Sequence, residues 1–153
     1  MDVTQLTAAV KVAIIFSGFF LWVGMLTGVW KYAQIRNSEL ARAHYYVDIA
    51  HRSSLLYAPA TLILAVLAYF SIFSDLLNLM FILINVAFFS FSILSYIVHG
   101  MLKDTSNQFK KPHQMGAWQM PTWMLSSAML LLIVGELGST LGLLVGTILK
   151  FMS

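Results

Sequence analysis

Residues 76–98 read LLNLMFILINVAFFSFSILSYIV, an apolar stretch without one charged side chain. Three further stretches are similar: residues 12–30 and 53–74 carry no charge, and residues 123–149 carry only Glu136. A helix needs about 20 predominantly apolar residues to cross the hydrocarbon core of a bilayer. The sequence therefore predicts an all-α integral membrane protein with a bundle of four transmembrane helices. The expected spans are approximately residues 10–32, 42–74, 76–101 and 120–150.

The composition supports this class. Of 153 residues, 59% are hydrophobic and 10% are charged, whereas a soluble domain carries about 25% charged residues. Four spans leave little mass outside the membrane, so residues 1–153 are expected to form a single domain. The chain has no cysteine, which excludes disulfides, thiolate metal sites and cysteine nucleophiles. A net charge of +3, held close to the membrane, does not favour a nucleic-acid partner.

The distribution of basic residues predicts the topology. Most of them flank the first and third connections, and few lie at the opposite ends of the spans. The first group comprises Lys31, Arg36, Arg42, Arg52, Lys103, Lys110 and Lys111, and the second comprises Lys11 and Lys150. By the positive-inside rule, both long connections are expected to be cytoplasmic and both termini non-cytoplasmic. The first span is expected to be retained rather than cleaved as a signal peptide, and a bacterial inner membrane is the expected location.

Polar side chains gather where the second span begins. His44, Asp48 and His51 are spaced i, i+4, i+7 and share one helical face. Titratable groups near hydrocarbon need a partner, water or a ligand. A second polar face, Asn85, Ser92, Tyr96 and His99, leads to the cytoplasmic end of the third span. These faces predict a ligand-binding mouth for an amphiphile or an anionic head group, formed by His44, Asp48, His51, Arg52, Ser53, Tyr96 and His99.

Two polar residues are expected deep in the membrane, Asn85 and Glu136. The favoured interpretation is a hydrogen bond between helices, with Asn85 as a candidate partner of Glu136. The alternative is a proton or ligand relay. Small residues allow close contact between helices in membranes. The sequence therefore predicts such contacts within the bundle or between protomers. The small residues are Gly24 and Gly28 in the first span and Gly135, Gly138, Gly142 and Gly146, expected on one stripe, in the fourth.

No known catalytic or phosphate-binding motif is present, and no metal site is predicted. The histidines leave one alternative open, a haem or metal protein using His51 and His99. The aromatic residues Trp30, Tyr45, Tyr46, Trp118 and Trp123 are interpreted as belts at the membrane boundaries.

Length, topology and the segment AHRSSLLYAP at residues 50–59 resemble the superfamily of membrane-associated proteins in eicosanoid and glutathione metabolism (MAPEG). Pro59 and Arg52 are similar to the family's Pro and basic residue in this helix, while Ser53 and Leu56 stand in place of its Asn and Glu. The resemblance implies a homotrimer, glutathione as a cosubstrate, and a glutathione S-transferase or peroxidase activity. Tyr96 and His99 are then the catalytic candidates.

The sequence thus leaves different classes of function open. The first is a MAPEG-like membrane protein that binds a lipophilic or amphipathic ligand, with or without glutathione-dependent catalysis. The second is a non-enzymatic small subunit or assembly partner of a larger membrane complex, and the third is the haem or metal-binding bundle.

Overall fold

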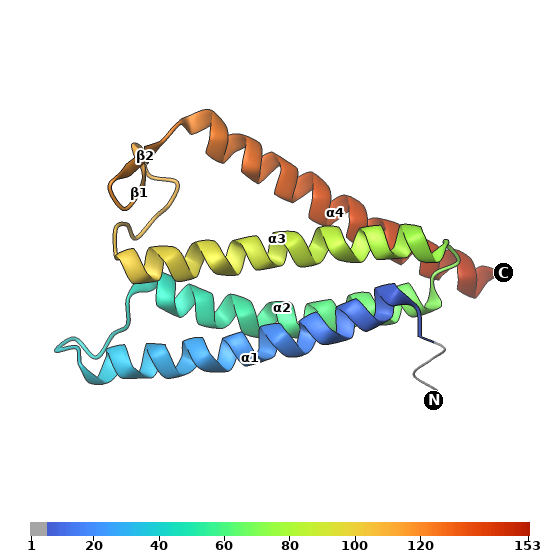
Figure 1. Ribbon diagram of the computed structural model, residues 1–153, viewed down its shortest axis with the longest axis horizontal. Helices are drawn as coiled ribbons and strands as arrows, with labels where there is room; N and C mark the ends of the chain where they lie inside the picture. Colours follow the sequence, from blue (N-terminus) through green and yellow to red (C-terminus); the bar gives the residue numbers. More distant parts are fainter. Residues whose placement is uncertain (1–5) are drawn as a thin grey trace.

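The computed structural model describes residues 6–153 and contains four long helices. They are α1 (Ala8–Arg36), α2 (Tyr45–Phe70), α3 (Asp75–Leu102) and α4 (Thr122–Met152). All four are long and apolar enough to cross a membrane, as predicted. Because the helices alternate in direction, α1 begins and α4 ends at the same end of the bundle (Figure 1). The N-terminus, part of the topology prediction, lies outside the described residues.

The connections differ from the sequence prediction in two places. The second span was expected over residues 42–74, whereas α2 begins only at Tyr45 and ends at Phe70. Ala41 has a positive φ of 48°, which an α-helix does not allow, and the His44 side chain caps the helix by accepting from the Tyr46 N–H. The third connection also contains a hairpin that was not predicted, formed by β1 (His113–Met115) and β2 (Trp118–Met120).

Helices α1 and α2 contact each other along much of their length. A Cβ on Gly24 would lie 2.6 Å from Leu55 Cδ2, and one on Gly28 would lie 2.8 Å from His51 Cε1. The Ser17 hydroxyl donates to the Ala58 carbonyl at 2.8 Å. The prediction of close packing at these two glycines is therefore confirmed, and the contact requires their lack of a side chain.

Helix α4 contacts α3 through its C-terminal half. A Cβ on Gly142 would lie 2.6 Å from Phe81 Cζ, and Gly135 is equally close to Phe88, whereas nothing lies within 4 Å of a Cβ on Gly138. Gly138 was predicted to belong to this packing stripe, and that prediction is wrong. Because helical residues four and seven apart share a face, the stripe is completed by Ser139 instead.

The predicted pairing of Asn85 with Glu136 is wrong. Asn85 Nδ2 donates to Ser139 Oγ at 2.7 Å, and Asn85 Oδ1 accepts from the Thr140 hydroxyl at 3.0 Å. These contacts use both ends of the buried Asn85 amide. They join α3 to α4 next to the glycine contacts, and Glu136 is left without this partner.

Beyond this contact, the N-terminal half of α4 diverges from α3, and the hairpin lies at the open end between the two helices (Figure 1).

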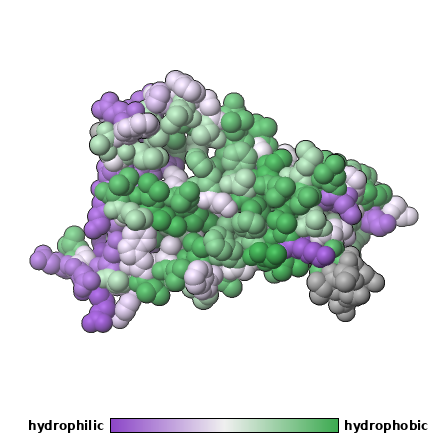
Figure 2. Space-filling model, viewed as in Figure 1, coloured by the Kyte–Doolittle hydropathy of each residue, from purple (hydrophilic) through white to green (hydrophobic). Residues whose placement is uncertain are grey.

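The hydropathy of the visible face varies along the length of the helices. Hydrophobic residues cover the middle of the helices, and hydrophilic residues gather toward the two ends (Figure 2). This distribution suits an integral membrane protein, because the hydrocarbon core contacts the middle of each span.

Candidate functional site

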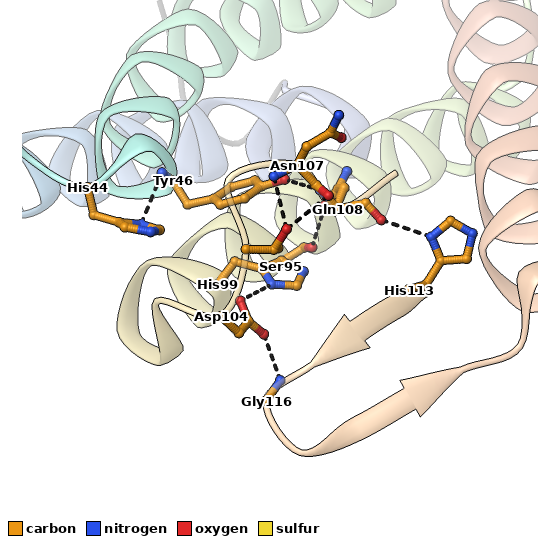
Figure 3. Close-up of polar contacts among 10 residues, drawn as sticks. His44, Tyr46, Ser95, His99, Asp104, Asn107, Gln108, His113 and Gly116 are labelled. Atoms are coloured by element: carbon orange, nitrogen blue, oxygen red, sulfur yellow. Dashed lines mark hydrogen bonds and ion pairs between the residues drawn. The ribbon is translucent and has the colours of Figure 1, made fainter. Parts of the chain in front are cut away.

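A polar cluster joins the ends of α2 and α3 to the third connection (Figure 3). His99 is buried in the last turns of α3, and its Nδ1 lies 2.8 Å from Asp104 Oδ1. The other carboxylate oxygen, Oδ2, accepts from the Gly116 N–H at 2.6 Å. Because a carboxylate only accepts, His99 donates through Nδ1, which fixes its tautomer when the ring is neutral. Asp104 thereby ties the tip of the hairpin to α3.

Tyr46 provides the link to α2. Its ring lies against that of His99, with centroids 5.0 Å apart, and stacks on Tyr96 at 6.0 Å. Its hydroxyl accepts from the Gln108 N–H at 2.5 Å. Tyr46 is only 3% exposed, so it is a buried anchor for the connection. The prediction that Tyr46 belongs to an aromatic belt is therefore wrong.

Two further contacts hold Gln108. The Ser95 hydroxyl donates to Gln108 Oε1 at 3.4 Å, and the buried His113 lies with Nδ1 3.1 Å from the Gln108 carbonyl (Figure 3). The part of the connection before the hairpin thus gains partners from α2, α3 and β1. Residues 103–121 therefore form a fixed cover over one end of the bundle.

The electrostatics of the cluster favour an ionised Asp104. Burial alone would raise the pKa of this carboxyl, but the hydrogen bonds from Gly116 and His99, together with the histidine charge, bring the pKa below its usual value. At the N-cap of α2, burial and the positive charge of Lys103 lower the pKa of His44. His44 is therefore expected to be neutral near neutral pH, which suits its role as an acceptor for Tyr46.

A cavity of about 420 Å³ lies between α3, α4 and the hairpin. This volume is within the range of small-molecule sites, about 300–1,000 Å³. Its walls are mainly apolar and rich in methionine, and polar groups are concentrated on the α3 side and near the hairpin. The lining residues are Tyr57, Phe91, Ser92, Ser95, Tyr96, His99, Gln108, Phe109, Met115, Met120, Met124, Leu125, Ala128, Met129 and Leu132.

The structure brings only part of the predicted mouth to this cavity. Tyr96 and His99, the catalytic candidates, line it, and Ser92 and Asn85 continue the same polar face of α3 toward α4. The predicted polar stripe of α3 therefore faces the space between these two helices.

The predicted residues at the start of α2 lie elsewhere. Asp48 bridges Lys31 of α1 at 2.6 Å and Arg52 at 2.7 Å. His51 faces α1, with Nδ1 2.8 Å from the Gly24 carbonyl. Ser53, next to Arg52, is half-buried and does not line the cavity. This face of α2 thus contributes to the contact with α1.

His44 lines a separate, open hollow beside the first connection, together with Arg42 and Lys103. The basic residues and the apolar cavity that the sequence placed in one mouth therefore lie at two positions in the structure.

The arrangement at His99 has part of the chemistry of a catalytic centre. A carboxylate that orients an imidazole through Nδ1 leaves Nε2 as a potential general base. The Ser95 hydroxyl, one turn earlier on the helix, donates to Gln108 and not to His99. The described contacts therefore support positioning of the cover, and they do not form a nucleophile–base pair.

Sequence reasoning overlooked two groups of residues. Tyr46 and Gln108 form long-range contacts that no local pattern reveals. The methionines of the cavity, in contrast, had a signal, because Met115, Met120, Met124 and Met129 are clustered in the sequence. Flexible, polarizable side chains of this kind are frequent at adaptable binding surfaces.

Within residues 6–153, no three or more His, Asp or Glu side chains are grouped as metal ligands. His51 and His99, the pair in the haem hypothesis, are each engaged by a different partner, the Gly24 carbonyl and Asp104. Comparisons with protein-family models, curated proteins and solved structures find no match to this chain.

Proposed function

We propose that this chain is an integral membrane protein that binds a lipophilic or amphipathic molecule in the cavity between α3, α4 and the hairpin. The observation that carries the proposal is the cavity itself, about 420 Å³ of space with apolar walls beside a buried polar cluster. Apolar cavities with a few placed polar groups are the usual form of small-molecule sites.

The position of the cavity supports a ligand that comes from the bilayer. On the outer side of α4, Leu130 and Leu131 are 62% and 64% exposed, so this helix presents apolar side chains to its surroundings as well as to the cavity. A molecule dissolved in the bilayer would reach the space between α3 and α4 without crossing a polar surface. The cover formed by residues 103–121 closes the end near His99.

The proposal is tested by filling the cavity. Ala128 lines it and is half-buried, so Ala128→Trp should occupy the space, while Ser127→Trp is a matched control at an exposed neighbouring position. Binding is measured with the neutral lipophilic fluorophore N-phenyl-1-naphthylamine, displaced by dodecanol. We expect Ala128→Trp to abolish displaceable binding and Ser127→Trp to retain it. Equal binding by the two variants would contradict the proposal.

A second candidate, assembly as a homotrimer or as a small subunit of a larger complex, is favoured by one observation. Large apolar side chains remain exposed along α1 and α4, including Ile15, Trp22, Val29 and Leu137. Lipid or another protein surface can cover such a face. The mass of the complex extracted in mild detergent distinguishes a homo-oligomer from a hetero-complex, and a monomer would exclude both.

Glutathione-dependent activity and MAPEG membership remain proposals that rest on the resemblance in length, topology and residues 50–59. Arg52, the basic residue in that resemblance, is held by Asp48. If glutathione binds there, Arg52→Ala should abolish its binding, measured by calorimetry, while leaving dodecanol binding unchanged. A bacterial inner membrane as the location is also a proposal. Fractionation of the native host would test it.

A further inference from the structure

We infer that the ligand of the α3–α4 cavity carries a cationic amine, which binds the carboxylate of Glu136 at the end of the cavity inside the membrane. This inference rests on the proposed function and specifies the chemical class of the ligand. It starts from an atom without a partner. Glu136 Oε1 is buried and has no hydrogen-bond partner among the described residues, and a buried polar group without a partner is costly.

Glu136 is not among the lining residues, but it lies on the same face of α4 as three residues that are. Leu125, Met129 and Leu132 line the cavity from this helix, and Glu136 follows Leu132 by four residues, one helical turn. Tyr57 and Tyr96 line the same cavity from α2 and α3. The carboxylate therefore continues the cavity-facing stripe toward the middle of the membrane.

The chain itself has no cation to offer at this depth. Residues 12–30, 53–74, 76–98 and 122–149 contain no Lys, Arg or His. The amide of Asn85, the candidate partner from the sequence, is already bound to Ser139 and Thr140. An ionised Glu136 therefore needs a cation from outside these spans, whereas without one the neutral, protonated form is favoured.

The rest of the cavity favours the same chemistry. The polar groups near the hairpin are paired with each other, Ser95 with Gln108 and His99 with Asp104, so they do not require a ligand. In contrast, the aromatic rings of Tyr57 and Tyr96 lie in the lining, and aromatic rings attract cations. A primary ammonium group has three donors for a carboxylate, while an anionic head group would be repelled.

The test uses three probes with the same alkyl chain, namely dodecylamine, dodecanol and dodecanoate, in displacement of N-phenyl-1-naphthylamine near neutral pH. Glu136→Gln keeps the shape of the side chain and removes its charge. We expect this variant to weaken dodecylamine binding by at least about tenfold, as for loss of a hydrogen bond between charged groups. Dodecanol binding should stay unchanged, and dodecanoate should be the weakest ligand of the unmodified protein.

Two further variants complete the experiment. Glu136→Asp, which keeps the charge, should retain a preference for the amine, and Asp75→Asn, which removes an exposed carboxylate at the start of α3, should bind all three probes as the unmodified protein does. An equal effect of Glu136→Gln on amine and alcohol, or no effect on either, would overturn the inference while leaving the cavity as a binding site. Failure of all three probes to bind would instead overturn the proposed function.

Discussion

The α1–α2 pair and the α3–α4 pair use similar residues but differ in how far the contact extends. Between α1 and α2, contacts run from Ser17 to Lys31 of α1, about 21 Å at 1.5 Å per residue. Between α3 and α4, the glycine and amide contacts lie between Gly135 and Gly142, about 10.5 Å. Beyond Gly135, α4 presents larger side chains and a cavity takes the place of the contact. Small residues therefore close a helix pair only along the part of the helix where they occur.

The largest effect is expected from breaking the closed pair. Gly24→Leu should destabilise the protein by about 1–3 kcal/mol through overpacking. Rotation of Leu55 cannot relieve the clash fully, because the Leu55 backbone nitrogen lies 3.3 Å from the new Cβ. Gly18→Leu on the same helix is the control, since nothing lies within 4 Å of a Cβ there. Thermal unfolding in detergent measures both variants, and equal melting temperatures would mean that α1 and α2 do not pack as described.

A smaller effect is expected in the α3–α4 pair. Gly142→Leu meets only the outer ring atoms of Phe81, which can move, so we expect a loss of about 1 kcal/mol, at the lower end of overpacking costs. Gly138→Leu, on the open side of α4, should have no effect. The same unfolding measurement applies. If Gly138→Leu destabilised the monomer more than Gly142→Leu, the orientation of α4 would be wrong.

A local effect is expected at the cover of the open end. Asp104→Asn loses charged hydrogen bonds to His99 and Gly116, so trypsin should cleave after the exposed Lys110 about tenfold faster. Cleavage is followed by mass spectrometry. Asp75→Asn, the loss of a carboxylate at the other end of the bundle, should leave the rate unchanged, and an unchanged rate in Asp104→Asn would show that this anchor does not hold the cover.

The same anchor predicts a pH dependence. The pKa of Asp104 is lowered by folding, so its contribution to stability is complete above the unfolded value of about 3.9 and is lost as the pH falls through the folded value. The Gly116 amide should report this in NMR, because its N–H donates to the carboxylate. Its chemical shift should titrate with a midpoint below that of an unfolded aspartate, and a higher midpoint would contradict the contact.

The sequence predicted the parts of the molecule that depend on local composition. The four spans follow from runs of apolar residues, and the polar face from Asn85 to His99 follows from helical periodicity. The partners of Asn85 could not be found in this way, because Ser139 and Thr140 are more than 50 residues away in the chain. Burial of Tyr46 likewise depends on Gln108 from a distant connection.

The hairpin and the cavity were beyond local reasoning for different physical reasons. Two three-residue strands have too little alternation to predict, although Gly116, with a φ of 61°, occupies the turn where a glycine is favoured. The cavity depends on the divergence of α4 from α3, which the sequence indicates only through the position of its small residues. Glu136 was expected to be an intramembrane group with Asn85 as its partner, but the Asn85 amide binds Ser139 and Thr140.

The central claim, that the space between α3 and α4 holds a lipophilic ligand, is tested most directly by photolabelling. A long-chain alcohol carrying an alkyl diazirine is irradiated with the protein, and labelled residues are identified by mass spectrometry with and without excess dodecanol. We predict that labelling of Met129 and Leu132, which line the cavity, is suppressed by dodecanol, while labelling of the outward-facing Leu130 and Leu131 is not. Equal labelling of the two faces of α4, insensitive to dodecanol, would contradict the claim.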